Sequence, residues 1–160
     1  MLKGTASLES AIENFDILKC MQCGICSGSC PSGRHTVLNI RRLVRRASHD
    51  PAVMEDESLW MCTTCYNCQE RCPRSVRIVD AVLRIREIAV HQGIILDSHR
   101  KVASLLLETG HAVPINEENT ERRKQLGLSE LPPTVHSVPD ALMEVKKLLK
   151  SCDFEEIVED

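Results

Sequence analysis

Eight cysteines fall into two runs of identical spacing, Cys-x2-Cys-x2-Cys-x3-Cys, each followed by proline. Three cysteines spaced three residues apart in a tight loop can reach three iron corners of a [4Fe–4S] cube, so the fourth ligand comes from elsewhere. In proteins with two such runs, the fourth cysteine of each run ligates the other cluster. This rule predicts one cluster on Cys20, Cys23, Cys26 and Cys72. It predicts a second cluster on Cys62, Cys65, Cys68 and Cys30.

Other roles for these cysteines fit the spacing less well. Structural zinc sites need four ligands and usually show paired Cys-x2-Cys elements. A third cysteine at the same spacing and a Cys-Pro pair are superfluous for zinc, and both occur twice here. Disulfides are disfavoured in a reducing compartment, and a thioredoxin-like site needs one cysteine pair beside a βαβ pattern, which this sequence lacks. Iron–sulfur clusters are the favoured interpretation, and zinc is the alternative that metal analysis separates from it.

The remaining reactive side chains are assigned to no site. Cys152 follows Leu142, Val145 and Leu149 on one helical stripe, and we expect it to be a small buried core residue. His35 is the histidine nearest a cysteine run, and we expect it not to be a ligand. The sequence shows no Ser/His/Asp set, Gly-rich phosphate loop or dinucleotide motif, so no catalytic residue is predicted.

The residues around the runs suit an anionic cluster. Gly24, Ser27 and Gly28 let backbone N–H groups approach the cluster sulfides. Pro31 and Pro73 can each begin a helix, whose positive N-terminal end would point at the cluster. Four further arginines lie near the runs and either offset the cluster charge or face solvent: Arg34, Arg71, Arg74 and Arg77.

The elements that must position these loops belong to an internal repeat with an offset of 42 residues, as from Cys20 to Cys62. Apolar positions three or four residues apart recur with this offset, as on one face of a helix. The matched pairs are Ile17 with Leu59, Leu18 with Trp60, Val37 with Val79, Ile40 with Val82, Leu43 with Ile85, and Ala47 with Ala89. Each unit is predicted to be an apolar lead-in, a cysteine loop and an amphipathic helix, packed with its copy about a pseudo-two-fold axis.

The whole chain is predicted to be all-α, with no strand. Helices are expected over residues 7–18, 35–48, 73–91 and 98–109, in a short polar segment after 120, and over 139–152. Ser7 is the expected N-cap of the first helix, and Gly110 is expected to end the fourth. We expect a two-cluster domain over residues 1–112 and a helical extension over 113–160 that serves docking to a partner protein.

Composition narrows the class of protein. The chain has 160 residues, of which 42% are hydrophobic and 27% charged, with a net charge of −3, as in a globular domain. No signal peptide or membrane-length apolar run is found, so a cytoplasmic location without a membrane span is expected. The charge balance and the 2% aromatic content give no support for nucleic-acid binding, although one predicted helix has a basic face of Arg41, Arg42, Arg45 and Arg46.

A chain with two closed clusters and no substrate site is expected to carry electrons between a donor protein and an acceptor protein. The alternative from another functional class is a redox-sensing binding module. Such a module would need a DNA-binding or ligand-binding element, and the sequence shows none.

The segments 20–31 and 62–73 resemble the α-helical ferredoxin domain of succinate dehydrogenase and fumarate reductase iron–sulfur subunits and of heterodisulfide reductases. The dehydrogenase subunits carry a plant-type [2Fe–2S] domain before this domain, whereas 19 residues precede Cys20 here. The short N-terminal helix and the stretches 31–34 and 127–135 resemble the iron–sulfur C subunits of the soluble heterodisulfide reductases of methanogenic archaea. The resemblance covers nearly the whole chain and is strongest through Gly110.

This resemblance implies an α-helical ferredoxin fold with two [4Fe–4S] clusters and a non-catalytic, electron-transferring role in an oxidoreductase complex. In that family, the C subunit passes electrons from a flavin-containing iron–sulfur subunit to a heterodisulfide-reducing subunit. The latter reduces the CoM-S-S-CoB heterodisulfide in methanogenesis, and a hydrogenase or formate dehydrogenase supplies the flavin-containing one. Related proteins serve other flavin-linked complexes, either heterodisulfide-reductase-like or fumarate-reductase-like, so that alternative stays open.

Overall fold

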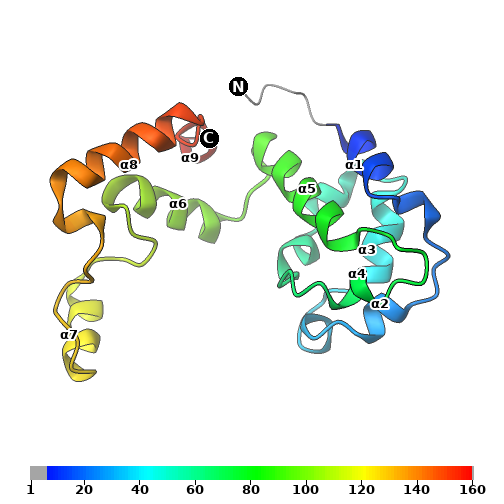
Figure 1. The fold of residues 1–160 in the computed structure, drawn as a ribbon, viewed down its shortest axis with the longest axis horizontal. Helices are drawn as coiled ribbons and strands as arrows, with labels where there is room; N and C mark the ends of the chain where they lie inside the picture. The colour runs from blue at the N-terminus through cyan, green and yellow to red at the C-terminus, as the bar shows by residue number, and fades with distance from the viewer. Residues whose placement is uncertain (1–6, 160) are drawn as a thin grey trace. The chain divides into compact units, whose positions relative to one another are not determined.

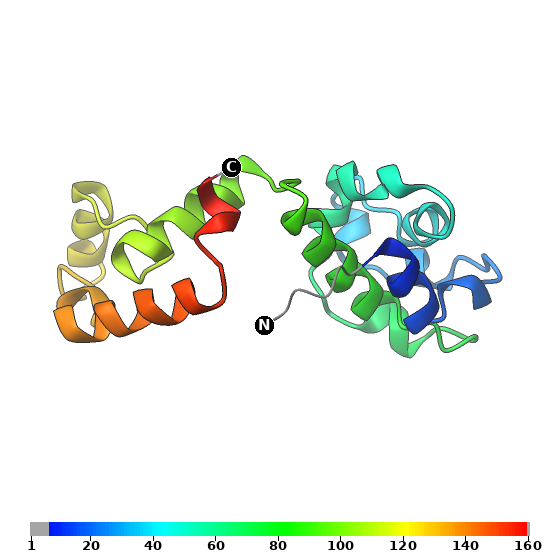
Figure 2. The ribbon, with the colours of Figure 1, turned by 90° about the horizontal axis from the view of Figure 1, so that it is seen from above.

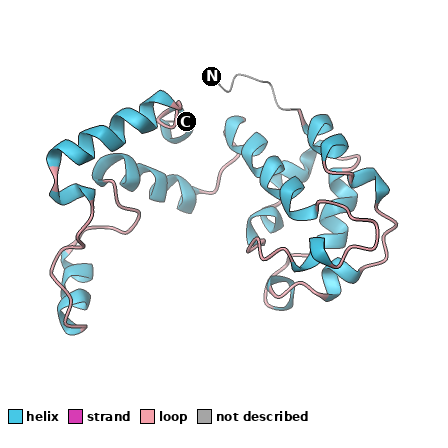
Figure 3. Ribbon diagram, viewed as in Figure 1, coloured by secondary structure: helices cyan, strands magenta, loops and turns pink. Residues whose placement is uncertain are grey.

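The structure is a computed structural model that describes residues 7–159. Every regular element in this range is an α-helix or a 3-10 helix, and the range contains no strand (Figure 3). The prediction of an all-α fold is therefore confirmed. The described residues divide into two compact units, 7–94 and 95–159. None of the described helices combines the length and the hydrophobicity that a transmembrane span requires.

The first unit carries both cysteine runs. Its three longer helices are α1 (Leu8–Asn14), α3 (Ile40–Ala47) and α5 (Ile78–His91). The cysteine loops contain the short helices α2 (Ile25–Gly28) and α4 (Asn67–Glu70). Four 3-10 helices connect these elements: η1 (Ile17–Lys19), η2 (Ser32–Arg34), η3 (Pro51–Glu55) and η4 (Glu57–Met61). Helix α5 contacts α1 and α4 (Figure 1, Figure 2), and it also contacts η3 and η4.

The core of the first unit follows the predicted repeat. Four of the matched pairs have both members buried, at most 2% exposed, in one aliphatic cluster: Ile17 with Leu59, Ile40 with Val82, Leu43 with Ile85, and Ala47 with Ala89. Burial of the matched apolar residues in a common core stabilises the two halves together.

Two predicted pairs do not follow the repeat. Leu18 is 70% exposed, whereas Trp60 packs partly buried against the core. The pair Val37 and Val79 also differs. Val79 is buried, whereas Val37 is 78% exposed. The predicted helix over residues 35–48 begins only at Ile40, because Asn39 caps it by accepting a hydrogen bond from the backbone N–H of Arg42. Val37 therefore precedes the helix and does not share its buried face.

The prediction that Pro31 and Pro73 each begin a helix is wrong for Pro73 and only weakly met at Pro31. Helix α5 begins at Ile78, because Ser75 adopts a left-handed backbone with φ 52° that interrupts any helix starting at Pro73. Pro31 precedes only the single 3-10 turn η2. Neither proline therefore begins a helix long enough to direct a positive N-terminal end at a cluster.

The second unit consists of α6 (Asp97–Thr109), α7 (Glu117–Gln125), η5 (Val135–Ser137), α8 (Pro139–Ser151) and α9 (Glu156–Glu159). Helix α6 packs against α8 and α9, and α8 packs against η5. This packing places the division between the units after Ile94, whereas the sequence predicted a boundary after residue 112. None of the described side chains in this unit is fully buried.

The prediction that Cys152 is a buried core residue is wrong. Cys152 is exposed and follows the last turn of α8 as its C-cap. The hydrophobic stripe that suggested burial does exist on α8, but a unit of this size and shape encloses no dry interior for it.

Gly110 ends α6 in the left-handed conformation, as the sequence predicted. Its φ is +67°, and a Cβ at this position would overlap Val135 Cγ2 and lie 3.2 Å from Leu142 Cδ1. Gly110→Ala is therefore expected to destabilise the second unit by more than about 1 kcal/mol, since backbone strain and steric overlap add. Thermal unfolding followed by far-UV circular dichroism measures the effect.

Gly127 provides the matched control, because its φ is +69° and a Cβ there meets nothing within 4 Å. Gly127→Ala should show the backbone strain alone and a smaller loss. Equal losses in the two variants would contradict the packing of Gly110 against Val135 and Leu142.

Candidate iron–sulfur site

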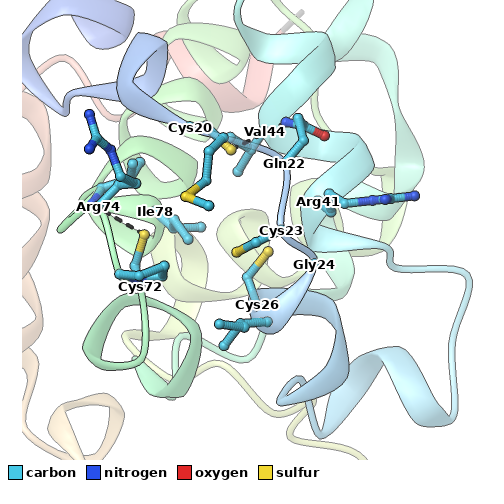
Figure 4. A pocket seen from close by; sticks show the side chains of 14 residues that line it. Cys20, Gln22, Cys23, Gly24, Cys26, Arg41, Val44, Cys72, Arg74 and Ile78 are labelled. Carbon is cyan, nitrogen blue, oxygen red and sulfur yellow. Dashed lines mark hydrogen bonds between the residues drawn. The ribbon is translucent and has the colours of Figure 1, made fainter.

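A partly open cavity in the first unit is lined by cysteines from both runs. Cys20, Cys23 and Cys26 of the first run lie on its wall together with Cys72 of the second. Figure 4 shows the sulfur atoms of Cys23 and Cys26 next to each other, with the Cys72 sulfur on the other side of the cavity. The structure thus brings together the four cysteines that the exchange of fourth ligands predicts for one cluster.

The second set of four cysteines combines one cysteine of the first run with three of the second. The segment that follows the first run contacts the start of the second run. Ser32 Oγ donates a 2.6 Å hydrogen bond to the Met61 carbonyl, which ties this segment to the residue before Cys62. Cys30 and Cys68 are both buried. Cys30 is also close enough to Cys68 for its charge to act on that thiol. This arrangement supports the predicted set Cys62, Cys65, Cys68 and Cys30.

The two loops share a backbone conformation that the sequence did not reveal. Gln22 and Thr64 occupy equivalent positions of the repeat, and both have positive φ angles, 59° and 52°. The same holds for Gly24 at 84° and Tyr66 at 62°. Left-handed backbone is costly for glutamine and tyrosine, and more so for β-branched threonine. Such strain at matched positions in both runs indicates that each loop is shaped to curve around a bound group.

Backbone and side-chain N–H groups are directed at several of the sulfur atoms. The backbone N–H of Gly33 donates to Cys30 Sγ at 3.3 Å, and that of Val76 donates to Cys72 Sγ at 3.4 Å. The Gln22 amide donates to Cys20 Sγ at 3.2 Å. Hydrogen bonds to ligand sulfurs stabilise the more negative, reduced state of a cluster and so raise its reduction potential.

Two buried thiols, Cys26 and Cys68, have raised pKa values. Burial, followed by the charges of neighbouring cysteines, raises the pKa of Cys68 to about 12. Burial also raises the pKa of the Cys26 thiol. Because thiolates are the metal-binding form, four of them at one site require compensating positive charge. Among the described residues no three His, Cys, Asp or Glu side chains converge on the position of a single ion. Four cysteines around a shared cavity are the ligand set that a [4Fe–4S] cluster takes.

The arginines near the two cysteine runs differ in the groups that they contact. Arg41 and Arg74 line the cavity, and both are exposed. Arg77 lies 2.9 Å from Asp80 and 5.1 Å from the centroid of the Phe15 ring, so it serves the packing of α1 on α5. Arg34 and Arg71 are exposed and lie outside this cavity. On the basic face of α3, Arg46 pairs with Asp50 and Asp56.

Several residues that hold the second loop were missed by the sequence analysis. The Asp80 carboxylate accepts hydrogen bonds from Tyr66 and Gln69 at 3.1 Å, and it also pairs with Arg77. Burial alone would raise the pKa of Asp80, but these hydrogen bonds outweigh it and hold the pKa below its usual value. Gln69 also accepts a 2.9 Å bond from the backbone N–H of Val79. Asp80 and Gln69 therefore join the cysteine loop to the start of α5.

Comparison with known proteins identifies a family model that matches the site and relatives that match most of the chain. Residues 16–76, which contain all eight run cysteines, match the 4Fe-4S dicluster domain family. The chain is 54% identical over 147 residues to the C subunit of the ferredoxin/F420H2-dependent CoB-CoM heterodisulfide reductase of Methanosarcina acetivorans, covering 91% of each chain.

Two further relatives come from other genera. The C subunit of the H2:CoB-CoM heterodisulfide,ferredoxin reductase of Methanothermobacter thermautotrophicus is 49% identical over 141 residues, covering 87% of this chain and 76% of the relative. The iron-sulfur C subunit of the CoB–CoM heterodisulfide reductase of Methanopyrus kandleri is 48% identical over 157 residues, covering 94% of this chain and 81% of the relative.

Proposed function

The chain belongs to the family of iron–sulfur C subunits of CoB-CoM heterodisulfide reductases, and from this premise we propose that it is the electron-relay component of such a complex. The observation that carries the proposal is the cavity that joins three cysteines of one run to the last cysteine of the other. Bound [4Fe–4S] clusters would supply one-electron carriers at the two sites.

The ligand sets are part of the proposal. Cys20, Cys23, Cys26 and Cys72 would hold one cluster. Cys62, Cys65, Cys68 and Cys30 would hold the other. The sets are neighbours, since α2 packs against α4 and the charge of Cys26 acts on the Cys68 thiol. Exchange of the fourth ligands would fix the two clusters close together, which a relay requires.

The proposed partners follow from the family. Electrons would enter from the subunit that holds flavin and iron–sulfur clusters. They would leave to the heterodisulfide-reducing subunit, where the CoM-S-S-CoB heterodisulfide is reduced in methanogenesis. A hydrogenase or formate dehydrogenase would supply the flavin-containing subunit. This chain would contribute no catalytic residue, and its side chains would hold and tune the carriers.

We further propose that the second unit, residues 95–159, binds one of these partner proteins. None of its described side chains is fully buried, and several large apolar side chains are exposed on it. An isolated unit with this exposure is poorly stabilised, whereas a protein interface would remove the apolar surface from water. The exposed residues are Val102, Val113, Leu126, Leu128, Leu131, Val138, Met143 and Leu148.

Anaerobic affinity purification of the tagged chain from its native host tests both proposals. We expect the flavin-containing and the heterodisulfide-reducing subunits to co-purify with the full chain. A chain truncated after Ile94 should keep about eight iron per chain, since two four-iron clusters lie in the first unit. It should lose at least about tenfold of the co-purifying proteins, equivalent to about 1.4 kcal/mol of binding free energy.

Three outcomes would contradict the proposals. Co-purification with nucleic acid and no redox protein would indicate a redox-sensing module. Co-purification with a flavoprotein but no heterodisulfide-reducing subunit would indicate a relay in another flavin-linked oxidoreductase. Loss of iron from the truncated chain would show that the second unit belongs to the cluster-binding fold and does not serve docking alone.

A further inference from the structure

Arg86 places a half-buried positive charge beside the second cysteine run. Its Nε and Nη2 donate to the Leu59 carbonyl at 3.0 and 2.7 Å, and Nη2 also donates to the Cys62 carbonyl at 2.8 Å. Its guanidinium lies 5.6 Å from the centroid of the Trp60 ring. These contacts fix the guanidinium against the loop that begins at Cys62.

The contacts of Arg86 hold its charge in place without neutralising it. Carbonyl oxygens and an aromatic ring are dipolar or quadrupolar partners, and neither carries a negative charge. In the part of the chain that the structure describes, no carboxylate forms an ion pair with Arg86. A charge withdrawn from water without a counter-ion is costly.

The anion that would compensate Arg86 is the group held by the cysteine loop. We propose that Arg86 is the internal counter-ion of the cluster on Cys62, Cys65, Cys68 and Cys30, and that its charge raises the reduction potential of this cluster. This inference rests on the cluster assignment proposed above. Reduction adds one negative charge, and a nearby cation in a medium of low dielectric constant favours the reduced state.

The internal repeat shows that only the second half has such an arginine at this position. The residue equivalent to Arg86, 42 positions earlier, is Val44, an apolar residue in the wall of the first cavity. The arginines of that cavity, Arg41 and Arg74, are exposed, so water and salt screen their charges. The two halves therefore give their clusters different electrostatic surroundings, and the sites are expected to differ in reduction potential.

Substitution of Arg86 tests the proposal by EPR-monitored redox titration of the full chain. In Arg86→Gln, which keeps an N–H donor but removes the charge, one cluster should become harder to reduce. At a fixed solution potential its reduced-to-oxidised ratio should fall about tenfold, or about 59 mV for one electron. The other cluster should titrate as in the unsubstituted chain. Arg86→Lys, which retains the charge, should restore most of the ratio.

Arg84→Gln is the matched control, because Arg84 lies one half-turn earlier on α5 and pairs with Glu87. It should leave both potentials unchanged. Equal loss in Arg86→Gln and Arg86→Lys would assign the effect to hydrogen-bond geometry and overturn the proposal, as would unchanged potentials in Arg86→Gln with full iron content. If Arg86→Gln loses iron, Arg86→Lys provides the test. An unchanged reduced-to-oxidised ratio in Arg86→Lys supports the counter-ion role, and a tenfold fall in that ratio overturns it. Too little iron in the unsubstituted chain would instead refute the cluster assignment itself.

Discussion

Replacing Cys23 and Cys30 together with alanine is expected to remove both clusters, whereas replacing Cys23 and Cys72 together is expected to leave one. The reason is the exchange of the fourth ligands. Cys72 lines the same cavity as Cys23, and Cys30 lies near Cys68. Iron and acid-labile sulfide should be near zero in the first variant and about four per chain in the second.

The two double variants distinguish the exchange from its alternative without the need to identify either cluster. If each run held its own cluster with all four of its cysteines, the iron contents of the two variants would be reversed. Cys152→Ala serves as a control, because Cys152 is exposed at the end of α8. It should bind as much iron as the unsubstituted chain.

Leu59→Ala is expected to produce the largest loss of stability of the single core substitutions. Leu59 is 0% exposed, lies in η4 shortly before Cys62, and offers its carbonyl to Arg86. Truncation of a fully buried leucine costs about 2–5 kcal/mol, because transfer free energy is lost and a cavity remains. Guanidinium unfolding of the cluster-loaded protein under anaerobic conditions, followed by circular dichroism, should show a lower midpoint.

Leu18→Ala is the matched control for this substitution. Leu18 also precedes a cysteine run, but it is 70% exposed. The same chemical change at an exposed position is expected to alter stability by less than about 0.5 kcal/mol. A loss as large as that of Leu59→Ala would show that the effect of Leu59→Ala does not come from its burial.

The architecture of the first unit was largely predictable from spacing. The 42-residue offset identified the buried partners Leu43 and Ile85 because helical periodicity places such residues on one face. The start of α5 was not predictable in this way. It depends on the left-handed backbone at Ser75, a serine with no sequence signal for that conformation. The burial expected for Cys152 failed because the periodicity does not reveal that α8 ends at Ser151, one residue before it.

The cysteine ligands of the candidate site could be predicted from the sequence. The residues that shape and hold the cysteine loops could not. Cysteine spacing is a strong chemical signal, whereas the positive φ angles of Gln22 and Thr64 carry no compositional mark. Arg86 has the sequence pattern of a surface arginine on an amphipathic helix. Its role depends on the carbonyls of Leu59 and Cys62, which only the tertiary structure brings to it.

The relay proposed for this chain requires that it hold two four-iron clusters. Quantitative iron and sulfide analysis of the anaerobically purified, unsubstituted chain tests that claim most directly. Two clusters predict about eight iron and about eight sulfide per chain, four of each for each cluster. About four iron or fewer, or zinc in stoichiometric amount, would contradict it.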